Sequence, residues 1–144
     1  MRACVAAGLA ILVLAGCGGG KDPADKAFAD HLNEICIAGE TRLAKLVEPT
    51  SAADIAPYAN AAIRVIRSEA SRMAKLDAPS DQKANLRTAL TILDQQVAAA
   101  QDMARAGVIG DTAQINEINK TIDRLHSQGQ AIARKLGAKD CARD

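Results

Sequence analysis

Apolar residues recur every three or four positions in four successive stretches of the 144-residue chain, with polar residues between them. This spacing places the apolar side chains along one face of an α-helix. Proline, glycine and short polar stretches separate the four segments, and such residues commonly end helices. The pattern therefore predicts four helices of similar length, at residues 23–48, 54–78, 81–106 and 112–136.

Residues with helix-capping chemistry mark the ends of these segments. Asp22, Ser80 and Asp111 precede the first, third and fourth segments, and their side-chain oxygens can accept hydrogen bonds from free backbone N–H groups. Gly107 and Gly137 follow the third and fourth segments, where a left-handed residue commonly closes a helix. We therefore expect short connections between consecutive helices.

The apolar faces form narrow seams. Their larger members are Phe28, Leu32, Ile35 and Leu43 in the first segment, Ile55, Ile63, Ile66 and Met73 in the second, Leu86, Leu90, Leu93 and Val97 in the third, and Ile115, Ile118, Ile122, Leu125 and Leu136 in the fourth. Narrow seams, similar lengths and short connections are typical of an all-α, up-down-up-down four-helix bundle. Gly39 and Gly129 interrupt two seams. We expect close helix approach at these glycines, and the alternative is a cavity large enough for a ligand.

The composition supports helices and argues against several kinds of binding site. The chain has 31 alanines, one tyrosine, one phenylalanine and no tryptophan. Alanine favours helices, whereas sites for single-stranded nucleic acid and for most sugars depend on aromatic stacking. Lys and Arg number 18 against 17 Asp and Glu, without a basic stripe. This balance argues against nucleic acid as a partner.

The start of the chain has the features of a lipoprotein signal peptide. Arg2 precedes an apolar run at residues 3–15, which is shorter than the roughly 20 residues that span a bilayer. The run ends in the letters LAGC, which match the lipobox of bacterial lipoproteins, with Cys17 as the cysteine. In that motif a lipid is attached to the cysteine thiol, and the chain is cut just before it.

Cleavage there divides the chain into three parts. Residues 1–16 form the signal peptide, residues 17–22 form the lipidated cysteine and a glycine-rich tether, and residues 23–144 form the bundle domain with a C-terminal tail. Stable anchoring takes two or more lipid chains, which lipoprotein processing supplies, palmitate among them. We therefore expect the domain to be lipid-anchored through Cys17 at the extracytoplasmic face of the cell membrane.

Two cysteines remain beyond the signal peptide and the lipidated residue. Cys36 lies on the shoulder of the first apolar face, and Cys141 lies in the tail beyond Gly137. An even number of cysteines in an exported, oxidising compartment allows a disulfide. In an up-down bundle, the tail must then turn at Gly137 and run back beside the first helix, or the fourth helix must end early.

Three stretches of the chain resemble a known group of sequences. They are AFADHLNEIC at 27–36, KLDAPSDQKANL at 75–86 and AIARKLGAKDCARD at 131–144, and they resemble uncharacterised actinobacterial-type lipoproteins. Those chains combine a lipobox with an N-x-I-C segment in helix one, an L-x-x-P break before helix three and a terminal L-G-x-x-x-C. The resemblance covers essentially the whole mature chain, and it implies that Cys36 pairs with Cys141. The group brings no established activity with it.

No residue pattern is typical of a catalytic or cofactor site. Di-iron sites in four-helix bundles use pairs of Glu-x-x-His motifs, and the nearest match is a single Asp123-x-x-His126. Met73 and Met103 fall on or beside core positions, where methionine usually fills space, and no C-x-x-C-H haem motif occurs. No G-x-S-x-G motif is present either. We therefore expect a non-enzyme without metal or cofactor. A metalloprotein, the third-ranked alternative, would need His126 to face inward beside two carboxylates.

Two polar side chains near the second seam have ordinary interpretations. Glu69 lies close in sequence to three arginines, at positions 64, 67 and 72, and is expected to pair with them on the surface. The functional alternative is an anion or peptide site, which the sequence does not favour. Tyr58 is the only tyrosine and is expected either to cover the end of the bundle or to act as a surface contact for a protein partner.

These observations predict a non-catalytic cell-envelope lipoprotein whose bundle binds or scaffolds another envelope protein. The anchor confines the domain to the membrane surface and so raises its effective concentration for partners there. The alternative is a carrier of a small molecule or lipid, with its site between the helices where alanine and glycine thin the seams.

Overall fold

The described chain consists of helices and turns. The computed structural model describes residues 22–143, so the predicted signal peptide and Cys17 lie outside the described residues. Within this range the elements are α1 (Pro23–Leu43), α2 (Ala52–Met73), α3 (Lys83–Ile109), α4 (Thr112–Lys135) and the short 3-10 helix η1 (Asp140–Ala142). Residues 22–143 contain no strand, and the predicted all-α fold class is confirmed.

The first two helices end earlier than the sequence pattern predicts. α1 ends at Leu43 and α2 ends at Met73, each six residues before a proline, at Pro49 and Pro79. A proline disfavours helical conformation in the preceding residue and cannot donate a backbone hydrogen bond. In both places the chain leaves the helix through tighter bonds between residues three apart, such as Leu46 N–H to the Leu43 carbonyl.

The capping predictions are correct at the first and last helix and wrong at the third. The side chain of Asp22 accepts a hydrogen bond from the backbone N–H of Ala24 at 2.9 Å, and Asp111 accepts one from Gln114 at 2.9 Å. α3 begins at Lys83, and its N-cap residue is Gln82. Ser80 lies in the preceding turn and does not cap the helix.

The end of α3 also differs from the prediction. The helix continues through Gly107 to Ile109, and Gly110 is the left-handed residue that closes it, with a φ of 69°. A Cβ atom at Gly107 would lie 2.9 Å from the Cβ of Ile55 on α2. Gly107 therefore serves close packing between α2 and α3 rather than a turn. At the end of α4, Gly137 has a φ of 74°, as predicted for a closing glycine.

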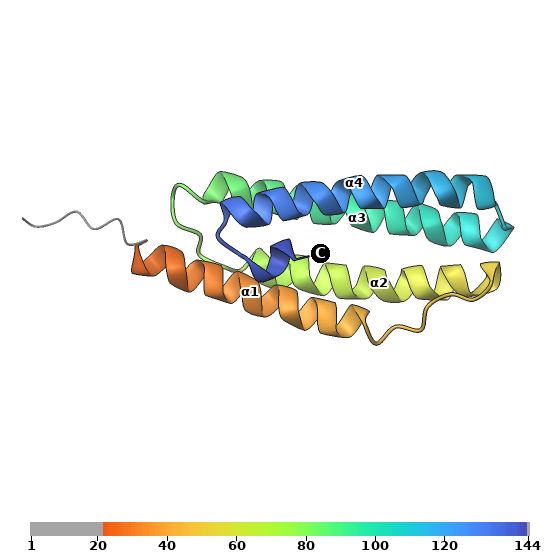
Figure 1. The fold of residues 1–144 in the computed structure, drawn as a ribbon, viewed down its shortest axis with the longest axis horizontal. Coiled ribbons are helices and arrows are strands. Elements are labelled where there is room, and N and C mark those ends of the chain that lie inside the picture. Colours follow the sequence, from red (N-terminus) through yellow and green to blue (C-terminus); the bar gives the residue numbers. More distant parts are fainter. Residues whose placement is uncertain (1–21, 144) are drawn as a thin grey trace, which may run out of the picture.

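Each helix packs against the next helix in the chain, but the first and last helices do not meet, so the bundle is open on one side. α1 packs against α2, α2 against α3, and α3 against α4. Within residues 22–143, no Cα atom of α1 lies within 8 Å of a Cα atom of α4. The 3-10 helix η1 contacts both α1 and α4, and Figure 1 shows it lying between the α1–α2 layer and the α3–α4 layer.

The hydrophobic core is divided accordingly into separate clusters. One cluster surrounds the tail and contains Phe28, Leu32, Leu136 and Ala138, the last of which is 1% exposed. A second cluster lies between α3 and α4, and a small third cluster lies between α2 and α3. The four predicted seams therefore do not meet in one continuous core.

The tail follows one of the two routes that the sequence left open. The chain turns at Gly137 and runs back beside α1, where the backbone N–H of Asp140 donates a hydrogen bond to Asn33 Oδ1 at 2.8 Å. Cys36 and Cys141 are joined by a disulfide, with their Cα atoms 5.2 Å apart. The tail thereby fills one end of the space between α1 and α4.

Candidate functional site

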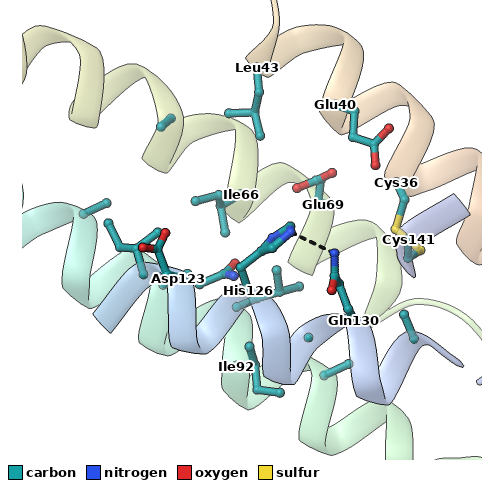
Figure 2. Close-up of a pocket in the computed structure, with 18 of the residues that line it drawn as sticks. Cys36, Glu40, Leu43, Ile66, Glu69, Ile92, Asp123, His126, Gln130 and Cys141 are labelled. Atoms are coloured by element: carbon teal, nitrogen blue, oxygen red, sulfur yellow. Dashed lines mark hydrogen bonds between the residues drawn. A yellow bond between two sulfur atoms is a disulfide. The ribbon is translucent and has the colours of Figure 1, made fainter. Parts of the chain in front are cut away.

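An apolar groove runs along the open side of the bundle. All four helices and the tail line it, and its volume is about 620 Å³. Figure 2 shows its middle section, with α1 and α2 on one side and α4 on the other. Pockets that bind small molecules usually measure about 300–1,000 Å³ and are largely apolar. The groove therefore has the size and chemistry of a ligand site.

The groove is lined by residues that the sequence pattern predicted to fill a closed core. They are half-buried because no opposite helix covers them: Ile55, Ile66, Leu93, Met103 and Ile122. Small residues at Ala59, Ala62 and Ala100 widen the space between the walls. At Gly129 a Cβ atom would lie 3.8 Å from its nearest neighbour, a methyl group of Ile92. Gly129 therefore lines the cavity, the alternative that the sequence had allowed, rather than a close helix contact.

Glu69 of α2 is a buried acid in the wall of the groove. It is 9% exposed, and within the described part of the chain its carboxylate has no hydrogen bond or ion pair. The surface pairing expected for Glu69 with the arginines at 64, 67 and 72 is wrong, because Glu69 is buried and forms no ion pair with them in the described chain. Arg42 of α1, which also lies near Glu69, donates hydrogen bonds to Ser68 Oγ and the Ala38 carbonyl instead. Burial raises the pKa of Glu69 to about 7, and repulsion by Glu40 adds to the rise in pKa against the attraction of Arg42 and Arg72.

Gly39 of α1 makes room for this carboxylate. A Cβ atom at position 39 would lie 1.4 Å from Oε1 of Glu69, so no other residue at that position leaves the carboxylate where it is. The sequence contained both signals, a glycine within one seam and an acid beside another. Their pairing depends on the register of α1 against α2, which a single sequence does not specify.

Polar side chains of α4 line the opposite wall. The Nε2 atoms of Gln130 and His126 lie 3.1 Å apart, and Gln130 Nε2 also donates a hydrogen bond to the Arg143 carbonyl at 2.9 Å. Figure 2 shows His126 and Gln130 across the groove from Glu69, with Asp123 farther along α4. Gln130 therefore connects the tail to α4 and contacts the Nε2 edge of the His126 ring.

The residues of the nearest metal motif do not come together as a metal site. Asp123 and His126 both lie along the groove, and both are largely exposed. Residues 22–143 contain no group of three or more His, Cys, Asp or Glu side chains arranged to hold a metal ion. The condition set for the metalloprotein alternative, two carboxylates within ligand reach of His126, is therefore not met in this part of the chain.

Tyr58, the possible surface contact, lies in the groove. It is half-buried, and its side chain forms part of the groove wall together with Ile55 and Pro49. The exposed large apolar residues lie elsewhere. They include Val47 in the α1–α2 connection and Val108 and Ile109 at the end of α3, which are 87%, 76% and 73% exposed.

Comparison with known proteins adds no further assignment. No family model, curated protein or solved structure matches the chain. No helix within residues 22–143 is long and apolar enough to cross a membrane. The fold and the site therefore define the class, an all-α helical bundle with an apolar groove between its layers, and arguments about function rest on the groove.

Proposed function

We propose that this protein is a lipid-anchored envelope protein that binds a small apolar or lipid molecule in the groove between its helix layers. The observation that carries the proposal is the groove itself, about 620 Å³ in volume and lined by side chains from all four helices. Burying apolar surface stabilises a complex by roughly 25 cal/mol per Å². A ligand that covers Ile66 and Ile122 would supply the contacts that a closed bundle supplies between its own helices. The proposal assigns binding rather than catalysis to the protein.

The anchored location is part of the same proposal. The LAGC motif at Cys17 supports cleavage after residue 16 and attachment of lipid to Cys17, on the pattern of the actinobacterial-type lipoproteins. The disulfide between Cys36 and Cys141 supports an oxidising, extracytoplasmic compartment. Contacts between helices that are consecutive in the chain support the up-down-up-down order.

Docking of another envelope protein, the function ranked first on the sequence, is the second candidate. The exposed side chains of Val108 and Ile109 favour it, because adjacent exposed apolar residues commonly mark an interaction surface. The groove favours the carrier function more strongly, since it draws on every helix and is shaped as a cavity.

A large side chain in the groove should weaken ligand binding. We expect Ala62→Phe to reduce the affinity for a neutral fluorescent probe, 1-N-phenylnaphthylamine, at least tenfold, because the phenyl ring would occupy the space that Ala62 leaves. The measurement is a fluorescence titration of the mature chain, residues 17–144, with Cys17→Ser to remove the lipid. This chain contains every residue that the structure describes.

The matched control for this titration is Ala98→Phe, since Ala98 is exposed on α3 and does not line the groove. It should bind the probe as the parent chain does. Equal binding by the parent, the Ala62→Phe chain and the Ala98→Phe chain would place the probe outside the groove and contradict the proposal.

A further inference from the structure

The chemistry of the ligand's polar end can be argued from Glu69. Placing a carboxylate in an apolar wall removes it from most of its water, and this costs free energy unless a hydrogen-bond donor or a cation compensates. Glu69 is 9% exposed, and within residues 22–143 it has no hydrogen bond or ion pair, although Arg42 and Arg72 attract its charge from a longer distance. The fold nevertheless has room for the carboxylate, because Gly39 has no side chain in the space that the carboxylate occupies.

The charges along the groove are of one sign. The ionisable side chains that line it are the acids Glu40, Glu69 and Asp123 together with His126 and Tyr58, and the lining contains no lysine or arginine. The guanidinium of Arg42 is directed to Ser68 and the Ala38 carbonyl. An anionic headgroup such as a carboxylate or phosphate would therefore meet three acids in the lining, with Arg42 and Arg72 acting only from outside it, whereas a cation would be attracted.

We infer that the groove takes a cationic amphiphile, a molecule with an apolar chain and an ammonium group, and that Glu69 binds the ammonium group. This inference rests on the proposed function and deepens it by naming the class of ligand. The apolar chain would lie along Ile66 and Ile122, and the ammonium would lie beside Glu69 in the middle of the groove (Figure 2). An ammonium carries three donors, and hydrogen bonds between charged groups are about twice as strong as neutral ones.

Four ligands with the same twelve-carbon chain separate charge from apolar contact. Dodecylamine is a cation with N–H donors, dodecyltrimethylammonium is a cation without them, dodecanol is neutral and dodecanoate is an anion. Each is titrated at pH 8 against the neutral probe bound to the mature Cys17→Ser chain. We expect dodecylamine to bind most tightly and dodecanoate most weakly, with at least a tenfold difference in affinity between them.

Two substitutions assign the selectivity to Glu69. Glu69→Gln keeps the shape and removes the charge, so it should weaken dodecylamine binding at least tenfold and leave dodecanol unchanged. Gly39→Ala should have the same effect by displacing the carboxylate. The control is Glu48→Gln, because Glu48 is exposed and does not line the groove, and it should change neither affinity. Thermal unfolding of each variant shows that it is folded.

The outcomes separate this inference from the proposed function. If none of the four ligands displaces the probe, or if the probe itself does not bind, both fail. If dodecanol binds but dodecanoate binds as tightly as dodecylamine, the groove is a binding site and the inference about the cation is overturned. Full retention of dodecylamine affinity by Glu69→Gln would overturn it as well.

Discussion

Replacement of Cys36 and Cys141 by serine should lower the free energy of unfolding by about 3–5 kcal/mol. The disulfide links residues 105 positions apart, and closing so long a loop restricts the unfolded chain strongly. It also holds the tail between α1 and α4, where Ala138 is 1% exposed. The measurement is urea denaturation of the mature Cys17→Ser chain with and without the two further substitutions.

The single variants test the origin of this effect. Cys36→Ser and Cys141→Ser should each lose about as much stability as the double variant, because either one removes the whole cross-link. A loss below about 1 kcal/mol in the double variant would mean that the tail holds its position without the disulfide.

Glu69→Gln should stabilise the protein at pH 8 and have little effect at pH 5. In the folded chain, burial raises the pKa of Glu69 from 4.5 to about 7. The unfolded chain therefore binds fewer protons than the folded chain between these values, and the stability of the parent protein falls as the pH rises from about 4.5 to about 7. Above that range the loss is complete, and glutamine, which does not ionise, avoids it.

The expected gain at pH 8 is about 2 kcal/mol. A shift of this size in the pKa corresponds to about 3 kcal/mol, and water in the open groove reduces the difference. Thermal or urea unfolding of both chains at pH 5, 6, 7 and 8 measures it, and the difference between the two chains at each pH gives the contribution of Glu69. The same difference at every pH would show that the Glu69 carboxylate is well solvated in the folded protein.

The sequence pattern predicted the helices better than it predicted their ends. Asp22 and Gly137 occupy the capping positions that their chemistry indicates. Gly107 and Gly110 could each have closed α3 by local chemistry alone, and packing against Ile55 of α2 decides between them. Local signals determine a helix end only where no tertiary contact competes for the same residue.

The groove could not be predicted from the seams. A seam of apolar residues is the same pattern whether it faces another helix or a cavity, and Ile66 and Ile122 fit both. The distinction depends on how far apart α1 and α4 lie, and the tail, which Cys141 joins to α1, lies between them. Glu69 also has the sequence pattern of a surface acid, because its position beside a seam does not show which helix packs against it. The structure buries it beside Gly39.

The most direct test of the ligand groove is the intact mass of the protein, extracted gently from the membranes in which the proposed anchor places it and measured under native and then denaturing conditions. After incubation with the neutral probe 1-N-phenylnaphthylamine, the native complex should exceed the covalent chain, including any lipid on Cys17, by the mass of one ligand, and denaturation should release it. The Ala62→Phe variant should show no such excess. A native mass equal to that of the covalent chain, both before and after incubation, would contradict the groove as a binding site and leave protein docking as the function to pursue by cross-linking in whole cells.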